Sequence, residues 1–228
     1  MQDKIKAVIF DMDGIIINSE PYWVKAETKT FKEVGIDFLD LENHKTVGLR
    51  IDEVVHYWHK KLQWKGLSTN EMVAKIIQEM VHYIRQYGES LPGLMETLEA
   101  LKSKGILIGL ASSSPSILIE ETLKKLNIKQ YFDHVQSAEN LSYGKPHPEV
   151  YITAAKKLKT DPLDCLVIED SLNGIIAGKA AKMTVVAIPD GTHKTSEQYK
   201  VADYQFNNLL TFKQTLLDVQ PMASIFQL

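Results

Sequence analysis

Two pairs of carboxylates, each placed directly after a short apolar run, are the residues of this sequence best suited to chemistry. Asp11 and Asp13 follow one run, and Glu169 and Asp170 follow another. Carboxylates gathered at one point repel each other unless a cation neutralises them, and their hard oxygens suit Mg²⁺. Mg²⁺ usually completes its octahedron with water and substrate phosphate. The pattern therefore predicts a magnesium site that handles a phosphorylated ligand.

Three consecutive serines and a lysine supply the other groups that phosphoryl transfer needs. Ser112, Ser113 and Ser114 follow a further apolar run, and Lys145 follows the weaker strand candidate Asp133–Ser137. Hydroxyls, loop N–H groups and an ammonium can hold the phosphoryl oxygens. A carboxylate beside the metal can attack phosphorus to give an acyl phosphate. A second carboxylate two residues on can protonate the leaving alcohol and later deprotonate the attacking water.

Each of these features has a plainer explanation when it is taken alone. An Asp-x-Asp-Gly tetrapeptide is more often a turn than a catalytic site. A serine cluster often caps a helix, as Glu169-Asp170-Ser171 could do for the helix that follows it. A lone lysine is usually a solvated surface charge. The combination favours a site, because each member follows its own apolar run.

The apolar runs have the length and the β-branched content of strands buried on both faces. The expected strands are Ile5–Phe10, Ile106–Ala111, Cys165–Ile168 and Thr184–Ile188, with Asp133–Ser137 and Tyr204–Phe206 as weaker candidates. Helical patterns lie between them at Leu94–Lys104, Pro115–Leu126, Pro146–Lys159 and Asn173–Lys182. Strands that alternate with helices predict an α/β fold with a doubly wound, Rossmann-like parallel sheet. Ligands bind such sheets at the carboxyl ends of the strands, where all the candidate residues fall.

The segment after the first strand breaks this alternation. It contains three amphipathic helical patterns and no convincing strand: Tyr22–Val34, Ile51–Leu62 and Asn70–Tyr87. Leu91-Pro92-Gly93 marks the return to the alternating pattern. We therefore expect a core domain of residues 1–18 and 91–220, with a helical cap domain of residues 19–90 inserted into it.

Four motifs together resemble the signature motifs of the haloacid dehalogenase superfamily. They are Phe10-Asp11-Met12-Asp13-Gly14, Leu110-Ala111-Ser112-Ser113-Ser114, Lys145-Pro146-His147-Pro148 and Ile168-Glu169-Asp170-Ser171. The helical insertion is similar to the small cap of the β-phosphoglucomutase-like subgroup. Residues 46–52 and 143–148 look most like those of 2-deoxyglucose-6-phosphate phosphatases, which also act on hexitol phosphates. The resemblance implies Mg²⁺-dependent hydrolysis of small sugar or sugar-alcohol phosphates.

The resemblance also implies a role for each motif residue. Asp11 would be the nucleophile and a metal ligand, and Asp13 the general acid/base that lends the metal its backbone carbonyl. The Ser112 hydroxyl and the Ser113 N–H would hold the phosphoryl group, with Lys145 bridging it to Asp11. Asp170 would bind the metal, with Glu169 either binding it directly or lying just behind the ligands.

Departures from the family pattern bear on the reaction. The mutases of this subgroup carry a catalytic cap histidine, and Trp23 stands at the corresponding position. This makes a phosphosugar mutase the alternative and hydrolysis the expectation. The usual Asp-Ser-Glu after the first motif reads Asn18-Ser19-Glu20. Arg50, in the cap, could face the substrate or form a surface ion pair.

Composition narrows the remaining possibilities. A net charge of -3 without a basic cluster gives no indication of a nucleic-acid-binding surface. No stretch approaches a membrane span, and the first apolar run is too short for a signal peptide, so we expect a cytoplasmic protein. The sequence does not determine the oligomeric state, for which a monomer is the working expectation. A phospho-signalling receiver domain would use similar residues, but it is shorter and lacks the cap. An inactive scaffold of the same family is disfavoured because every motif residue is present.

Overall fold

The computed structural model describes residues 5–41, 46–189 and 197–217. At its centre is a six-stranded sheet in the order β3-β2-β1-β4-β5-β6, in which every neighbouring pair is parallel. The strands are β1 Ala7–Phe10, β2 Leu107–Ser112, β3 His134–Ser137, β4 Cys165–Glu169, β5 Thr184–Ala187 and β6 Tyr204–Gln205. The predicted doubly wound parallel sheet is therefore confirmed, including its two weaker strands.

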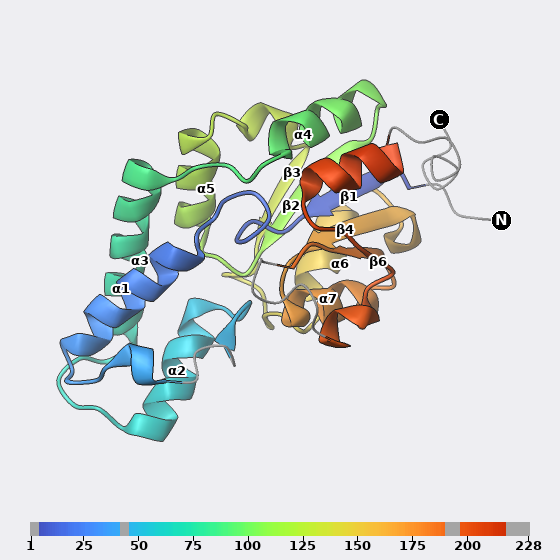
Figure 1. Cartoon of the computed structure of the whole chain (residues 1–228). Helices are drawn as coiled ribbons and strands as arrows, with labels where there is room; N and C mark the ends of the chain where they lie inside the picture. The colour runs from blue at the N-terminus through green and yellow to red at the C-terminus, as the bar shows by residue number, and fades with distance from the viewer. Residues whose placement is uncertain (1–4, 42–45, 190–196, 218–228) are drawn as a thin grey trace.

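Helices cover both faces of the sheet and form the insertion after β1 (Figure 1). They are α1 Glu20–Lys32, α2 Ile51–Leu62, α3 Thr69–Tyr87, α4 Leu94–Ser103, α5 Ser116–Lys125, α6 Glu149–Lys157, α7 Leu172–Ala180 and α8 Leu209–Phe212. Short 3₁₀ turns lie at Phe38–Asp40, Lys129–Tyr131, Pro162–Asp164 and Glu197–Val201, and a π-helical turn at Lys213–Leu217. None of the helices described here is long and apolar enough to cross a membrane.

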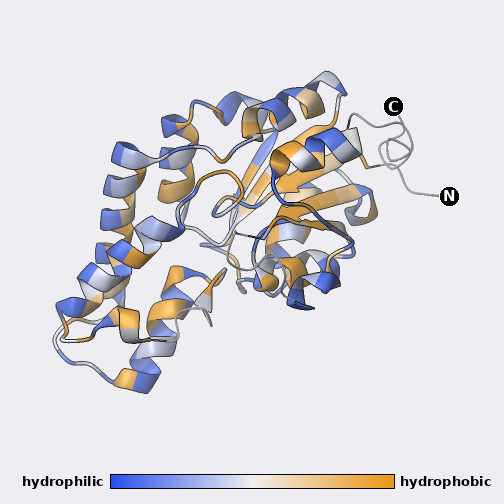
Figure 2. Ribbon diagram, viewed as in Figure 1, coloured by the Kyte–Doolittle hydropathy of each residue, from blue (hydrophilic) through white to orange (hydrophobic). Residues whose placement is uncertain are grey.

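Alternate residues of β1 enter two different hydrophobic layers. Val8 and Phe10 pack into the layer that includes α4, α5 and α8, whereas Ala7 and Ile9 pack into the layer of α6 and α7. This is the period of two that a strand imposes, with both of its faces buried. The central strands β1 and β4 are accordingly among the most apolar parts of the ribbon in Figure 2.

The insertion between β1 and α4 packs largely on itself. Helix α3 lies against α1 and α2, and its C-terminal end also contacts α5 (Figure 1). The two chain segments that join the insertion to the core lie side by side. Ile17 forms a β-bridge with Ser90, and Leu91 N–H donates to the Ile16 carbonyl at 3.1 Å. These contacts lie at the boundary that the sequence predicts between core and cap, and on that basis we propose residues 19–90 as a cap domain.

One predicted helix begins later than expected. The pattern placed a start at Pro146, but α6 begins at Glu149 and Pro148 occupies its N-cap. Prolines lack the N–H and disfavour helical backbone in the residue before them, so Lys145-Pro146-His147-Pro148 forms a turn. Residues 1–4, 190–196 and 218–220 of the expected core domain lie outside the described residues.

Candidate active site

The strand order reverses between β1 and β4, and the carboxylates lie at the carboxyl ends of these two strands. Phe10 pairs with Ile168, and Asp11 N–H donates to the Ile168 carbonyl at 3.0 Å. This register brings Asp11, which follows β1, beside Glu169 and Asp170 at the end of β4. Such a topological switch point is where open α/β sheets bind ligands.

Three carboxylates form a compact cluster at this point. One oxygen from each of Asp11, Glu169 and Asp170 lies within 4.8 Å of the others. Gly14 makes room for it: its φ is +76°, and a Cβ there would lie 2.0 Å from Asp170 Oδ2. The side chain of Asp13 is not part of this group of oxygens. A set of hard oxygen donors at this spacing suits Mg²⁺.

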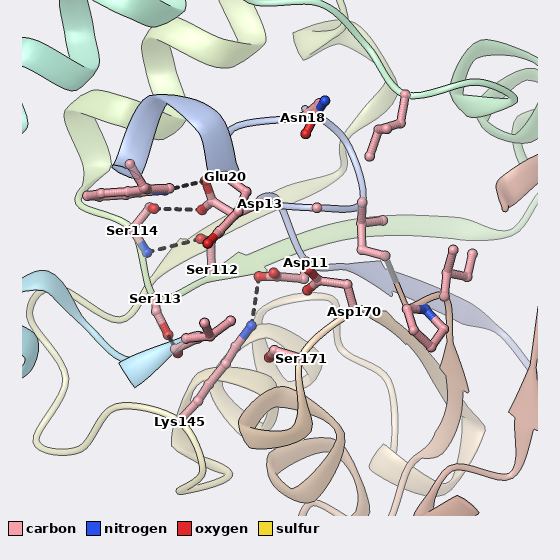
Figure 3. A pocket seen from close by; sticks show the side chains of 18 of the residues that line it. Asp11, Asp13, Asn18, Glu20, Ser112, Ser113, Ser114, Lys145, Asp170 and Ser171 are labelled. Atoms are coloured by element: carbon pink, nitrogen blue, oxygen red, sulfur yellow. Dashed lines mark hydrogen bonds and ion pairs between the residues drawn. The ribbon is translucent and has the colours of Figure 1, made fainter. Parts of the chain in front are cut away.

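Lys145 is buried within this cluster, although a lone lysine is usually exposed (Figure 3). Its Nζ lies 2.7 Å from Asp11 Oδ1 and 2.6 Å from Glu169 Oε1. Burial alone would lower the pKa of Lys145, but the two carboxylates outweigh it and hold the pKa above its usual value. Lys145 is therefore a fixed positive charge against Asp11.

The single lysine does not neutralise the whole cluster. Burial raises the pKa of Asp11 to about 8, against the opposing effect of Lys145 and with help from Glu169 and Asp13. Burial and Glu169 likewise raise the pKa of Asp170. A cation bound beside these carboxyl groups would favour their ionised forms. The charge balance thus fits the predicted metal.

Glu169 is engaged at both carboxylate oxygens. Oε1 accepts from Lys145 and from the Tyr151 hydroxyl at 2.5 Å. Oε2 accepts from the backbone N–H groups of Asp170 and Ser171 and from the Ser171 hydroxyl, each at 3.1 Å. The side chains with room for a cation are therefore Asp11 and Asp170, and we propose that Glu169 orients Lys145 from behind them.

The Asp13 carboxylate faces the cap rather than the cluster (Figure 3). Its Oδ1 accepts from the Ser19 hydroxyl at 2.5 Å and from Trp23 Nε1 at 3.0 Å, and its Oδ2 accepts from the Ser114 hydroxyl at 2.7 Å. Trp23, which stands where the mutases carry a histidine, thus donates to the expected general acid/base. These donors hold Asp13 at one side of the cavity, beside the space a leaving group would occupy.

The hydroxyl groups of Ser112, the last residue of β2, and of Ser113 after it have different partners. Ser112 Oγ accepts from Ser114 N–H at 3.0 Å, which leaves its own O–H free to donate to a phosphoryl oxygen. Ser113 Oγ donates to the Gly48 carbonyl in the cap at 2.8 Å. The Ser113 hydroxyl is therefore committed to the cap, and its backbone N–H is the group we propose for the ligand.

A cavity of about 490 Å³ lies between core and cap, within the range of roughly 300–1,000 Å³ typical of small-molecule sites. Its core wall contains every residue to which the motifs assign a role except Glu169, and its cap wall comes from α1, residues 46–49 and the start of α2. Arg50 does not line it. The Arg50 guanidinium donates outside the cavity to the carbonyls of Ala138 and Leu141, at 3.3 and 2.9 Å, and pairs with Asp52 and Glu53.

Three residues of this network were not assigned a role from the sequence. Tyr151 on α6 reaches Glu169 from the layer behind the sheet, and nothing in its apolar helical context marks it. Ser19 and Ser114 reach Asp13 from opposite sides. Ser114 lies within the second motif and Ser19 shortly after the first, so their positions in the sequence could have marked them as possible partners of Asp13.

The sheet, the switch-point carboxylates and the capped cavity define a class of phosphate-handling α/β enzymes. The model of the haloacid dehalogenase-like hydrolase family matches residues 8–188, and the chain belongs to that family.

Individual relatives cover nearly the whole chain. Hexitol phosphatase B of Escherichia coli strain K12 is 40% identical over 93% of this chain and 97% of its own. The phosphorylated carbohydrates phosphatase of Thermotoga maritima is 30% identical over 78% of this chain and 82% of its own. The crystal structure of β-phosphoglucomutase from Clostridium difficile superposes with a TM-score of 0.83 and 28% identity, covering 98% of this chain and 97% of that one.

Proposed function

We propose that this chain is a Mg²⁺-dependent phosphatase that hydrolyses small sugar or sugar-alcohol phosphates through a phosphoryl-aspartate. The observation that carries the proposal is the pairing of Asp11 with Lys145 inside the carboxylate cluster. The hexitol and carbohydrate phosphatases among the relatives support the substrate class.

In this proposal Asp11 and Asp170 hold the cation, together with the backbone carbonyl of Asp13. When bound, Mg²⁺ would neutralise the carboxylates and the phosphoryl oxygens. Lys145, the Ser112 hydroxyl and the Ser113 N–H hold the phosphoryl group against Asp11, whose Oδ1 already contacts Lys145. Asp11 attacks phosphorus as Asp13 gives a proton to the leaving alkoxide.

Asp13 then serves a second time, as a base. It takes a proton from the water that attacks the acyl phosphate, and Asp11 is released as a carboxylate while phosphate leaves. Ser19, Trp23 and Ser114 keep the Asp13 carboxylate in place for both steps.

Two observations favour hydrolysis over mutase activity. The indole N–H of Trp23 only donates, so it cannot shuttle protons as a cap histidine can. A mutase that passes its phosphoryl group to a second hydroxyl of a sugar phosphate must also accommodate a sugar bisphosphate. Among the described residues that line the cavity, Lys145 is the only cation, and it is held at the Asp11 end. The described lining therefore offers a second phosphate no positive partner away from Asp11.

A panel of phosphate esters tests the proposal. We expect stoichiometric phosphate release from hexitol phosphates, hexose 6-phosphates and 2-deoxyglucose 6-phosphate, with nucleotides much poorer. β-Glucose 1-phosphate should yield glucose and phosphate, if it reacts, without accumulation of glucose 6-phosphate. Net isomerisation to glucose 6-phosphate faster than phosphate release would overturn the assignment in favour of the mutase.

A further inference from the structure

One face of α1 forms part of the cap wall of the cavity. Glu20, Trp23, Val24 and Glu27 all line it. Trp23, Val24 and Glu27 follow Glu20 by three, four and seven residues, which places all four on the same side of a helix. Trp23 accounts for the position of Asp13, but Glu27 has no part in the chemistry described so far.

Glu27 is a buried carboxyl group without a protein partner. Its side chain lines the cavity and the residue is only 9% exposed. Within the described part of the chain, no residue forms a hydrogen bond or an ion pair with it. The cavity wall on the cap side is otherwise mostly apolar, with the side chains of Val24, Val47, Leu49, Ile51 and Val54. The oxygens of Glu27 are not among the enclosed polar atoms that lack a partner, so they are open to the cavity, where a ligand can form hydrogen bonds with them.

The charge at this end of the cavity indicates which ligand groups it can accept. Burial, with a smaller contribution from Glu20, raises the pKa of Glu27 to about 8. Near neutral pH the carboxyl therefore carries a proton, and it can both donate and accept hydrogen bonds. Among the described residues at this end of the cavity, a second phosphate would meet an acidic group and no cation, since Arg50 donates to backbone carbonyls outside the cavity. Of the described lining, Glu27 therefore suits hydroxyl groups better than a second anion.

We propose that Glu27 binds the hydroxyl groups of a singly phosphorylated polyol, at the end of the substrate remote from its phosphate. This inference rests on the proposed phosphatase function and adds the residue that selects the substrate. The phosphate is held at Asp11 and Lys145, and the hydroxylated tail extends towards α1. Glu27 thereby favours polyol monophosphates over unhydroxylated esters and over bisphosphates.

The test compares two substrates in three variants. Sorbitol 6-phosphate carries hydroxyls along its chain, and phenyl phosphate has none. Glu27→Leu should lower kcat/KM for sorbitol 6-phosphate by about 10- to 100-fold, mainly through KM, as expected for lost hydrogen bonds in a buried site. Glu27→Gln can still donate and accept, so its loss should be smaller. Phenyl phosphate turnover should stay within about twofold in both, since hydrogen bonds it never makes cannot be lost.

Glu33→Gln is the matched control, because Glu33 caps the same helix and pairs with Lys75 outside the cavity. It should leave both substrates unchanged. Thermal unfolding of each variant monitors the fold. An unchanged kcat/KM for sorbitol 6-phosphate in Glu27→Leu, or an equal loss with both substrates, would overturn the role of Glu27 alone. If wild-type enzyme prefers phenyl phosphate to every polyol phosphate, the proposed substrate class fails, and this inference fails with it.

Discussion

Asp11 and Asp13 are two residues apart in the sequence, yet their surroundings differ. Asp11 is buried beside Lys145 and the other carboxylates, whereas Asp13 accepts hydrogen bonds from Ser19, Trp23 and Ser114. The first arrangement suits an anion that attacks, and the second suits a group that exchanges protons with a leaving alcohol and water. The two environments support the division of roles that we propose for Asp11 and Asp13.

Replacing Asp11 by asparagine tests the first of these roles. Asp11→Asn should abolish turnover, because an amide does not attack phosphorus. The fold should persist, since the amide oxygen can still accept from Lys145 and one buried charge is removed. Phosphate release and thermal unfolding are the measurements, with Asp52→Asn in the cap as a control. If the variant kept about a tenth of wild-type kcat, catalysis through a covalent Asp11 would be excluded.

At the scale of the element, α1 carries residues that lie at two different parts of the cavity. Trp23 reaches Asp13, and Glu27 lies one turn further along the same face of the helix. A helix in the cap can therefore position the proton-transfer group and contact the substrate tail together. Small changes in this helix are expected to alter specificity without touching the phosphate site.

The raised pKa of Glu27 predicts a stability effect of known sign. The folded-state pKa of about 8 lies above the ordinary value of 4.5, so the fold favours the protonated form. The contribution of Glu27 to the free energy of unfolding is therefore fully present below about pH 4.5 and is lost as the pH rises through about 8. Glu27→Gln cannot ionise and should escape this loss. Of the other charged groups lining the cavity, Glu20 adds to the shift, and Asp11, Asp13, Lys145 and Asp170 belong to the phosphate end.

The measurement is the melting temperature of both proteins from pH 5 to pH 9. The advantage of Glu27→Gln over wild type should grow with pH, whereas Glu33→Gln should show no such trend. A difference that does not change with pH would contradict a buried, ionisable Glu27.

Local patterns predicted the elements better than they predicted side-chain contacts. The limits of α2 match the predicted Ile51–Leu62, because its amphipathic period and its ends are encoded locally. The contacts of Arg50 depend instead on carbonyls 88 and 91 residues away. The sequence could place Arg50 at the start of a helix but could not decide which way it points. The unpartnered carboxyl of Glu27 was missed for the same reason.

At the scale of the whole molecule, polar contacts hold the cap loop of residues 46–50 against the core. Ser113 donates to the Gly48 carbonyl, Asn173 donates to the Val47 carbonyl at 2.8 Å, and Arg50 donates to the core loop after β3. These contacts close the cavity over the carboxylates. The parallel sheet and the order of the motifs were predictable, since strand spacing and topology determine them. The contacts that close the cavity were not predictable, because they join segments that lie far apart in the sequence.

The cation is the component on which the whole arrangement is expected to depend. A chelator should abolish phosphate release, and Mg²⁺ should restore it. Ca²⁺ should inhibit, since its longer bonds and higher coordination number would misplace Asp11. Mg²⁺ should also raise the melting temperature, because it binds only the folded cluster. Full activity in metal-free buffer would rule out a metal role for Asp11 and Asp170.

The phosphorylated intermediate at Asp11 is the central claim, and Asp13→Asn exposes it most directly. The amide keeps the shape of Asp13 and can still accept from Ser19 and Trp23, but it cannot activate water. With a ³²P-labelled ester that has a very acidic alcohol, which needs no proton on leaving, attack should proceed and hydrolysis of the acyl phosphate should stall.

Rapid acid quench, followed by digestion and mass spectrometry, should then find the label on the peptide that contains Asp11, and hydroxylamine should release it. The absence of label, together with wild-type steady-state rates on a sugar phosphate, would contradict both the covalent intermediate and the role of Asp13.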